Sequence, residues 1–182
     1  MSASESRKAA SRYRIDKQRA ETIINADTVD IGTPRISPAE RAQELLRLGE
    51  KALGQRMYSA AATSLEEGIS LGELEPSAFA QARFLLAVAL LGGRRPSLCT
   101  GSELDRVCDL LRTLSEPRAV FLATLVEEDR TNAWMSSPAV PDSLRLNAQQ
   151  VDRPSADLIR RHVPAPQSRV WRVLDERAGE PT

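Results

Sequence analysis

Apolar residues recur at three- and four-residue intervals from residue 38 to residue 131, and this spacing predicts a series of amphipathic helices. The intervals are interrupted by glycine, proline and short polar stretches, where we expect the connections. The pattern predicts five helices, at about residues 38–53, from Tyr58 to near Gly72, from Pro76 to Gly92, from Ser102 to Leu114, and from Pro117 to Arg130.

Several of these helix ends have recognisable signals. The stretch Ser37-Pro38-Ala39-Glu40 combines an N-cap serine, a proline at the first helical position and an acid three residues after the cap. The third helix, "SAFAQARFLLAVALL", is apolar nearly all round and should be the central element, and Gly92-Gly93 suit a left-handed C-cap. We expect Ser102 to cap the fourth helix. Short connections make neighbouring helices antiparallel, so the predicted fold class is all-α, a short helical-hairpin solenoid of about five helices, with a generic five-helix bundle as the alternative.

The first two predicted helices resemble a tetratricopeptide repeat, a helix pair with small residues where the helices cross. In "LRLGEKALGQRMYSAAATSLEEGISL", the family's Leu-Gly, Tyr, Ala, aromatic and Ala positions hold Leu48-Gly49, Tyr58, Ala61, Leu65 and Gly68. Leu65 departs from the family's aromatic residue and Gly68 departs from its alanine. The resemblance covers about residues 38–130 and implies a peptide- or partner-binding surface rather than a catalytic site.

One variety of this family holds a terminal carboxylate with a lysine and an asparagine on the first helix. The matching positions here are Leu46 and Glu50. A leucine and an acid do not bind a carboxylate, so we predict no ligand of that class.

The flanking segments differ from the helical part in composition. Residues 1–36 include six Lys or Arg between Arg7 and Arg19 against the single acid Asp16, and we expect a basic, disordered arm. Residues 132–182 begin with a stretch rich in Pro, Ser, Asn and Gln, which predicts a linker followed by a short helical tail. Trp171 in this tail can anchor it onto the helical domain, our first interpretation, or onto a partner.

The segment "TIINADTVDIGTP", residues 22–34, is a β-prone island within the arm. Its core, Val29-Asp30-Ile31-Gly32 after Asn25, resembles bacterial amyloid signalling sequences of the RHIM-like type, in which Ile/Val-Gln-Val/Ile-Gly follows an asparagine. Asp30 stands where those sequences have glutamine. The resemblance implies self-assembly through residues 22–33, by stacking of identical copies; alternatively the island is a linker or a hairpin that adds to a partner's sheet. Its candidate partner-binding residues are Ile23, Ile24, Asn25, Val29, Ile31 and Gly32.

The sequence offers little that indicates catalysis. It has no phosphate-binding loop, no dinucleotide-binding glycine motif and no HExxH motif, and we expect neither an enzyme nor a bound cofactor or metal. His162, the only histidine, is expected to be an exposed structural residue in a short helix or turn. Cys99 and Cys108 fit no metal-binding spacing and are interpreted as buried, reduced thiols.

Two charged clusters also have structural interpretations. Three consecutive acids, Glu127-Glu128-Asp129, fan around a helix and are expected to form a solvated helix end rather than a metal site. Arg94-Arg95 follow the end of a helix, where positive charge is favourable. A structural cap explains these arginines as well as an anion or partner site does, and we retain them as candidate partner-binding residues.

Overall charge and hydropathy restrict the choice of function. The 25 basic residues balance the 25 acidic ones, which gives no general attraction to nucleic acid, and the absence of long apolar runs predicts a cytoplasmic protein without a membrane segment. Lys8, Lys17 and Lys51 are the only lysines, an arginine skew typical of a GC-rich bacterial genome. We therefore expect a non-catalytic adaptor for another protein, in a bacterial signalling or defence system. The alternatives are a nucleic-acid-associated regulator that uses the basic arm and an accessory subunit of a neighbouring enzyme.

Overall fold

Every regular element that the structure describes is helical, which confirms the predicted all-α class. The computed structural model describes residues 36–131 and 142–164, of which those from Ser37 onward lie in one compact unit. The elements are α2 (Pro38–Gly54), α3 (Tyr58–Ser70), α4 (Pro76–Leu91), the 3-10 helix η1 (Pro96–Leu98), α5 (Gly101–Arg112), α6 (Pro117–Thr131), α7 (Asp142–Gln150) and α8 (Arg153–His162).

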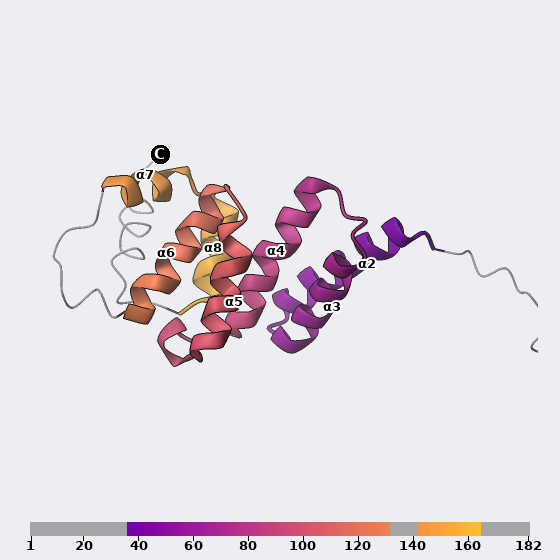
Figure 1. The fold of residues 1–182 in the computed structure, drawn as a ribbon, viewed down its shortest axis with the longest axis horizontal. Coiled ribbons are helices and arrows are strands. Elements are labelled where there is room, and N and C mark those ends of the chain that lie inside the picture. Colours follow the sequence, from indigo (N-terminus) through magenta and orange to yellow (C-terminus); the bar gives the residue numbers. More distant parts are fainter. Residues whose placement is uncertain (1–35, 132–141, 165–182) are drawn as a thin grey trace, which may run out of the picture. The chain divides into compact units, whose positions relative to one another are not determined.

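Helices that follow one another in the chain pack side by side, from α2 through to α7 (Figure 1). Contacts between helices further apart in the chain join these pairs, because α2 also packs against α4, and α8 contacts both α4 and α6. The helix α8 therefore returns to the middle of the helical array, and this return forms one wall of the site described below.

The helix α2 begins as its sequence predicts. Ser37 Oγ accepts a hydrogen bond from the Glu40 backbone N–H at 3.1 Å, and Glu40 Oε2 accepts one from the Ser37 N–H at 2.8 Å. This reciprocal pair is a capping box that satisfies N–H groups with no partner inside the helix. Pro38 occupies the first turn, where its missing N–H costs nothing.

The helix α4 is the central element, as predicted. Most of its residues from Ala82 onward are buried, including Phe84 and Leu85 at 1% exposure each. The helix ends at Gly92, whose φ of 61° lies in the left-handed region that glycine adopts without steric cost.

The fourth predicted helix begins two residues earlier than expected, because Thr100, not Ser102, is its N-cap. The Thr100 hydroxyl accepts from the Glu103 N–H at 3.3 Å, and Glu103 Oε2 accepts from the Thr100 N–H at 2.7 Å. Capping from Thr100 places a glutamate at the third helical position, which completes a second capping box. The prediction from Ser102 overlooked this threonine-to-glutamate spacing.

The helices α2 and α3 pack closely at two glycines. A Cβ built on Gly49 would lie 2.6 Å from Leu65 Cγ, and one on Gly68 would lie 3.3 Å from Leu45 Cβ. Gly49, Gly68 and Leu65 are all buried, so the two backbones approach one another where there is no side chain to separate them. This agrees with the role that the sequence assigned to small residues in the first helix pair.

The helical region continues past residue 131, where the sequence predicted that the helical domain ends. Part of the predicted linker forms α7, and α8 follows directly. Ala148, Val151, Ile159 and Val163 from this region belong to the same apolar cluster as the residues of α4 and α6. Short apolar patterns in a polar, proline-rich stretch gave too weak a periodic signal for α7 to be predicted, whereas the region of α8 was predicted as a short helix or turn around His162.

Candidate functional site

A hollow of about 530 Å³ lies between α2, α4 and α8, and we call it the α8 hollow. The chain contributes to it from three separate places: the end of α2, the middle of α4, and most of α8. Leu53 and Leu85 are buried core residues that form its apolar floor, and Leu158 and Pro154 add apolar surface from α8. Its charged lining consists of Glu50, Asp157, Arg153 and Arg161.

The helix α8 is fixed at its start by a local cap. Asp152 Oδ1 accepts from the Ser155 N–H at 2.8 Å, and the Ser155 hydroxyl donates to Asp152 Oδ2 at 2.7 Å. One side of the helix then packs into the core through Ile159, which is fully buried. Side chains at three- and four-residue spacing on another side, from Arg153 through Asp157 to Arg161, line the α8 hollow.

At its other end, α8 is attached to α3 through His162. The His162 Nδ1 atom and the Tyr58 hydroxyl lie 3.2 Å apart, within hydrogen-bond distance, and the two rings meet edge to face with centroids 5.7 Å apart. His162 is 2% exposed, so the expectation of an exposed histidine is wrong. Burial, together with the nearby charges of Arg161 and Arg56, lowers the pKa of His162 below its ordinary value.

The position of His162 escaped sequence reasoning because its partner Tyr58 is 104 residues away in the chain. A lone histidine in a polar tail has no local signal that distinguishes a buried ring from an exposed one. The sequence analysis singled out Tyr58 only as the residue at the tyrosine position of the repeat that the first helix pair resembles.

Two successive side-chain hydrogen bonds orient Gln81 at the edge of the α8 hollow. The Arg118 guanidinium on α6 donates to Gln81 Oε1 at 2.6 Å, and Gln81 Nε2 donates to Glu50 Oε1 at 3.4 Å. The Arg118 guanidinium also lies over the Phe84 ring, 4.8 Å from its centroid. Three helices thus hold the amide of Gln81 and the carboxylate of Glu50 at one rim of the hollow.

A second hollow, of about 600 Å³, lies along α2 and the α3–α4 connection. We call it the glutamate hollow, because five of its lining residues are Glu40, Glu44, Glu50, Glu73 and Glu75. Glu50 lines both hollows, so they adjoin at this residue. Leu46 also lines the glutamate hollow; with Glu50 it occupies the positions at which the sequence excluded a carboxylate ligand. Together the two hollows form what we call the groove.

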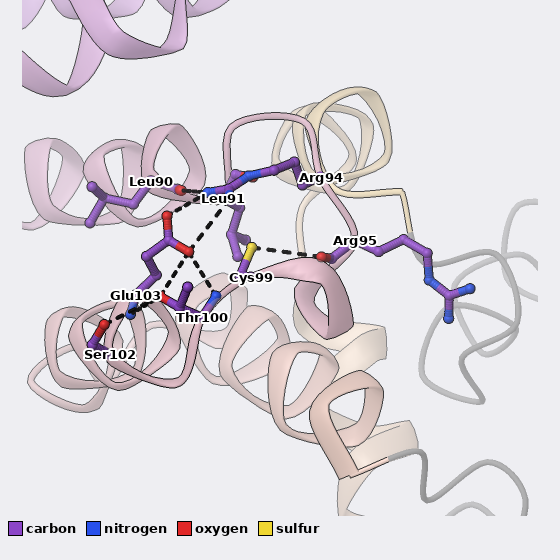
Figure 2. A network of polar contacts seen from close by, with 8 residues as sticks. All are labelled: Leu90, Leu91, Arg94, Arg95, Cys99, Thr100, Ser102 and Glu103. Atoms are coloured by element: carbon purple, nitrogen blue, oxygen red, sulfur yellow. Dashed lines mark hydrogen bonds and ion pairs between the residues drawn. The ribbon is translucent and has the colours of Figure 1, made fainter.

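The predicted partner-binding arginines lie elsewhere and have structural roles. Arg94 donates to the Leu90 and Leu91 carbonyl oxygens at the end of α4 and forms an ion pair with Glu103 at 2.9 Å (Figure 2). Arg94 therefore caps α4 and joins it to α5, which agrees with the interpretation of this arginine as a structural cap. With the Thr100 cap, this ion pair lowers the pKa of Glu103 to about 2.

The side chain of Arg95 points away from that network (Figure 2). Its Nη2 donates to Asp129 Oδ1 at 2.8 Å, and the Ser97 N–H donates to Asp129 Oδ2 at 2.9 Å. Asp129 is 1% exposed and Glu128 is 8% exposed, so the predicted solvated helix end is wrong for both. Burial by itself would raise the pKa of Asp129, but the hydrogen bonds from Arg95 and Ser97 outweigh it and the pKa is lowered.

The two cysteines are free thiols, as predicted, although only Cys108 is fully buried. The remaining candidate residues, Trp171 and those of the island at residues 22–33, lie outside the residues that the structure describes.

The described part of the chain shows no cluster of metal-ligating side chains and no membrane-spanning helix. Among residues 36–131 and 142–164, no group of three or more His, Cys, Asp or Glu side chains is arranged to hold a metal ion. No helix within the same ranges is long and apolar enough to cross a membrane. Comparison of the chain with protein-family models, curated proteins and solved structures gave no match.

Proposed function

We propose that this protein is a non-catalytic adaptor, and that the groove formed by the α8 hollow and the glutamate hollow binds a segment of a partner protein. The observation that supports this proposal most directly is the α8 hollow, which combines an apolar floor with charged groups at its rim. Apolar pockets edged by polar groups are the usual anchoring points of protein interfaces. We also propose, as the sequence predicted, that the helices have a tetratricopeptide-like arrangement and that the protein is cytoplasmic.

Hydrogen bonds hold part of the lining in place, which supports binding of a ligand to a preformed surface. Gln81 and Glu50 are held by hydrogen bonds from neighbouring helices, and the His162 ring lies within hydrogen-bond distance of the Tyr58 hydroxyl. A lining fixed before the ligand arrives loses little conformational entropy on binding. The side chains of the α8 hollow contain no serine, threonine or cysteine that could serve as a nucleophile.

Gly54 allows a sharp test, because it lines the α8 hollow and a Cβ built there meets no atom within 4 Å. A Gly54→Trp variant should fill the hollow without disturbing the core. Gly101→Trp is the matched control: Gly101 is the first residue of α5, its Cβ also meets nothing within 4 Å, and it does not line either hollow.

The measurement is selection of peptides from a displayed random 16-residue library on the full-length protein, followed by calorimetric titration of the selected peptides. We expect peptides that bind the wild type and the Gly101→Trp variant equally and bind Gly54→Trp at least tenfold more weakly. Circular dichroism of both variants confirms that they are folded. If no peptide is selected, or if selected peptides bind Gly54→Trp as well as they bind the wild type, the groove is not the binding site.

Self-assembly through the island at residues 22–33 is a separate part of the proposal. Thioflavin binding and sedimentation of the full-length protein beside an Ile31→Asp variant test it, since a charge at that position disfavours stacking of identical copies. Soluble behaviour of both proteins under all conditions would remove the island from the proposal.

A further inference from the structure

The two halves of the groove differ in charge. Five glutamates line the glutamate hollow and the only basic residue in its lining is Arg47. In the α8 hollow, by contrast, the acids Glu50 and Asp157 are balanced by Arg153 and Arg161. The negative charge of the groove is therefore concentrated at the end formed by α2 and residues 73–75.

Few of these glutamates are neutralised by a basic side chain of the protein itself. Within the described part of the chain, Glu44 is the one among the five that makes an ion pair, with Arg47 at 2.6 Å. Hydrogen bonds from Ser37 lower the pKa of Glu40, and those from Arg47 lower the pKa of Glu44. Glu73 and Glu75 are exposed in the α3–α4 connection, and the Glu75 side chain makes no capping hydrogen bond. Like charges gathered in one hollow repel each other, and a cationic ligand relieves that repulsion.

We propose that the occupant of the groove is a peptide segment in which basic residues flank an apolar anchor. The Lys or Arg side chains lie over the glutamate hollow, and the apolar side chain lies in the α8 hollow against Leu158 and Pro154, which are more exposed than the buried Leu53 and Leu85. Acidic segments and nucleic-acid phosphates are disfavoured by the same charges. This inference rests on the proposed function and goes beyond it by stating the chemistry of the partner.

The peptide selection on full-length protein described above also tests this inference through the sequences that it enriches. We expect groove-dependent peptides, defined as those lost with Gly54→Trp, to have a net positive charge and at least one large apolar residue. Raising NaCl from 50 to 500 mM should weaken their binding, since exposed charge pairs are screened over about 10 Å at 0.1 M salt.

A triple variant measures the contribution of the acids directly. The combination Glu50→Gln, Glu73→Gln and Glu75→Gln removes three charges from the groove without removing a capping hydrogen bond, because the side chain of Glu75, the N-cap residue of α4, makes none. We expect binding of the enriched peptides to weaken about tenfold, the combined effect of three exposed ion pairs, and to lose most of its salt dependence. The control combination is Glu66→Gln, Glu67→Gln and Asp109→Asn, which removes three exposed charges on α3 and α5, outside both hollows. Its affinity should stay within about twofold of the wild type.

The outcomes separate this inference from the proposed function. Groove-dependent peptides that are neutral or acidic, or that bind both triple variants equally, would overturn the inference and leave the adaptor function standing. Failure to select any groove-dependent peptide would overturn both. If sedimentation shows instead that the protein dimerises and that Gly54→Trp makes it monomeric, the occupant is a second copy of the chain and the basic partner is refuted.

Discussion

The close packing of α2 against α3 predicts that alanine has opposite effects at two glycines of the same helix. In a Gly49→Ala variant the new Cβ would lie 2.6 Å from Leu65 Cγ and 2.7 Å from Leu65 Cδ2. Leu65 is fully buried, so it has no solvent-facing space into which to move. In Gly54→Ala, at the last residue of the same helix, the Cβ meets no atom within 4 Å.

The expected change in unfolding free energy is the sum of a favourable helix contribution and an unfavourable packing contribution. Replacing glycine by alanine inside a helix gains up to about 1 kcal/mol from backbone entropy. Overpacking a well-filled core costs about 1–3 kcal/mol. Because the helix term favours both variants, the difference in unfolding free energy between them is close to the packing cost. A difference of about 2 kcal/mol corresponds to roughly 4–8 °C in Tm for a chain of this size.

Thermal and urea unfolding of the full-length wild type and both variants, followed by circular dichroism at 222 nm, measures this difference. We expect Gly54→Ala to unfold at or above the wild-type temperature and Gly49→Ala below it. A Gly49→Ala variant as stable as Gly54→Ala would refute the argument, because it would mean that α2 and α3 are not packed closely at Leu65.

Three further predictions concern buried groups. Asp129→Ala removes the acceptor of Arg95, and we expect a loss of about 2–3 kcal/mol in urea unfolding. This is less than the ~3–5 kcal/mol typical of a fully buried pair, because the Arg95 side chain is 31% exposed and can be hydrated; a loss under ~1 kcal/mol would contradict the prediction. Because the pKa of His162 is lowered in the folded protein, the unfolded chain binds a proton at this histidine at a higher pH than the folded protein does. The urea midpoint should therefore fall between pH 7 and pH 5, and it should fall less in a His162→Gln variant, whereas identical slopes would show that His162 titrates normally. Burial raises the pKa of the thiols of Cys108 and Cys99, and Cys108 is only 5% exposed. Iodoacetamide at pH 7.5 should therefore alkylate Cys108 more slowly than Cys99 in the native protein and both equally in urea, and equal native rates would argue against this burial.

The helices of residues 38–131 were predictable because their signals are local. The spacing of apolar residues set the five helices, the Ser37–Glu40 pair set the start of α2, and Gly92 set the end of α4. Each of these signals acts within a few residues of chain, where backbone hydrogen bonding and side-chain capping are decided. The Thr100 cap was of the same kind and could have been found from its spacing to Glu103.

The candidate site could not be predicted in this way, because its parts come from distant places in the chain. The groove needs α8 to return to α4, and it places Glu50, Gln81 and Asp157 around one hollow. The sequence had named Glu50 only to exclude a carboxylate ligand. It left Arg94 and Arg95 open between a structural cap and partner binding, and the structure uses them for a cap and for an ion pair with the buried Asp129.

By itself, then, the sequence determined the helical class, the order of the helices from α2 to α6 and the central place of α4, since periodicity and caps depend on neighbouring residues. Tertiary structure alone decided that His162 and Asp129 are buried and that α8 closes one side of a groove. Burial of a polar group is favourable only when a partner meets it. Tyr58 and Arg95 meet these two groups only after the chain has brought distant helices together.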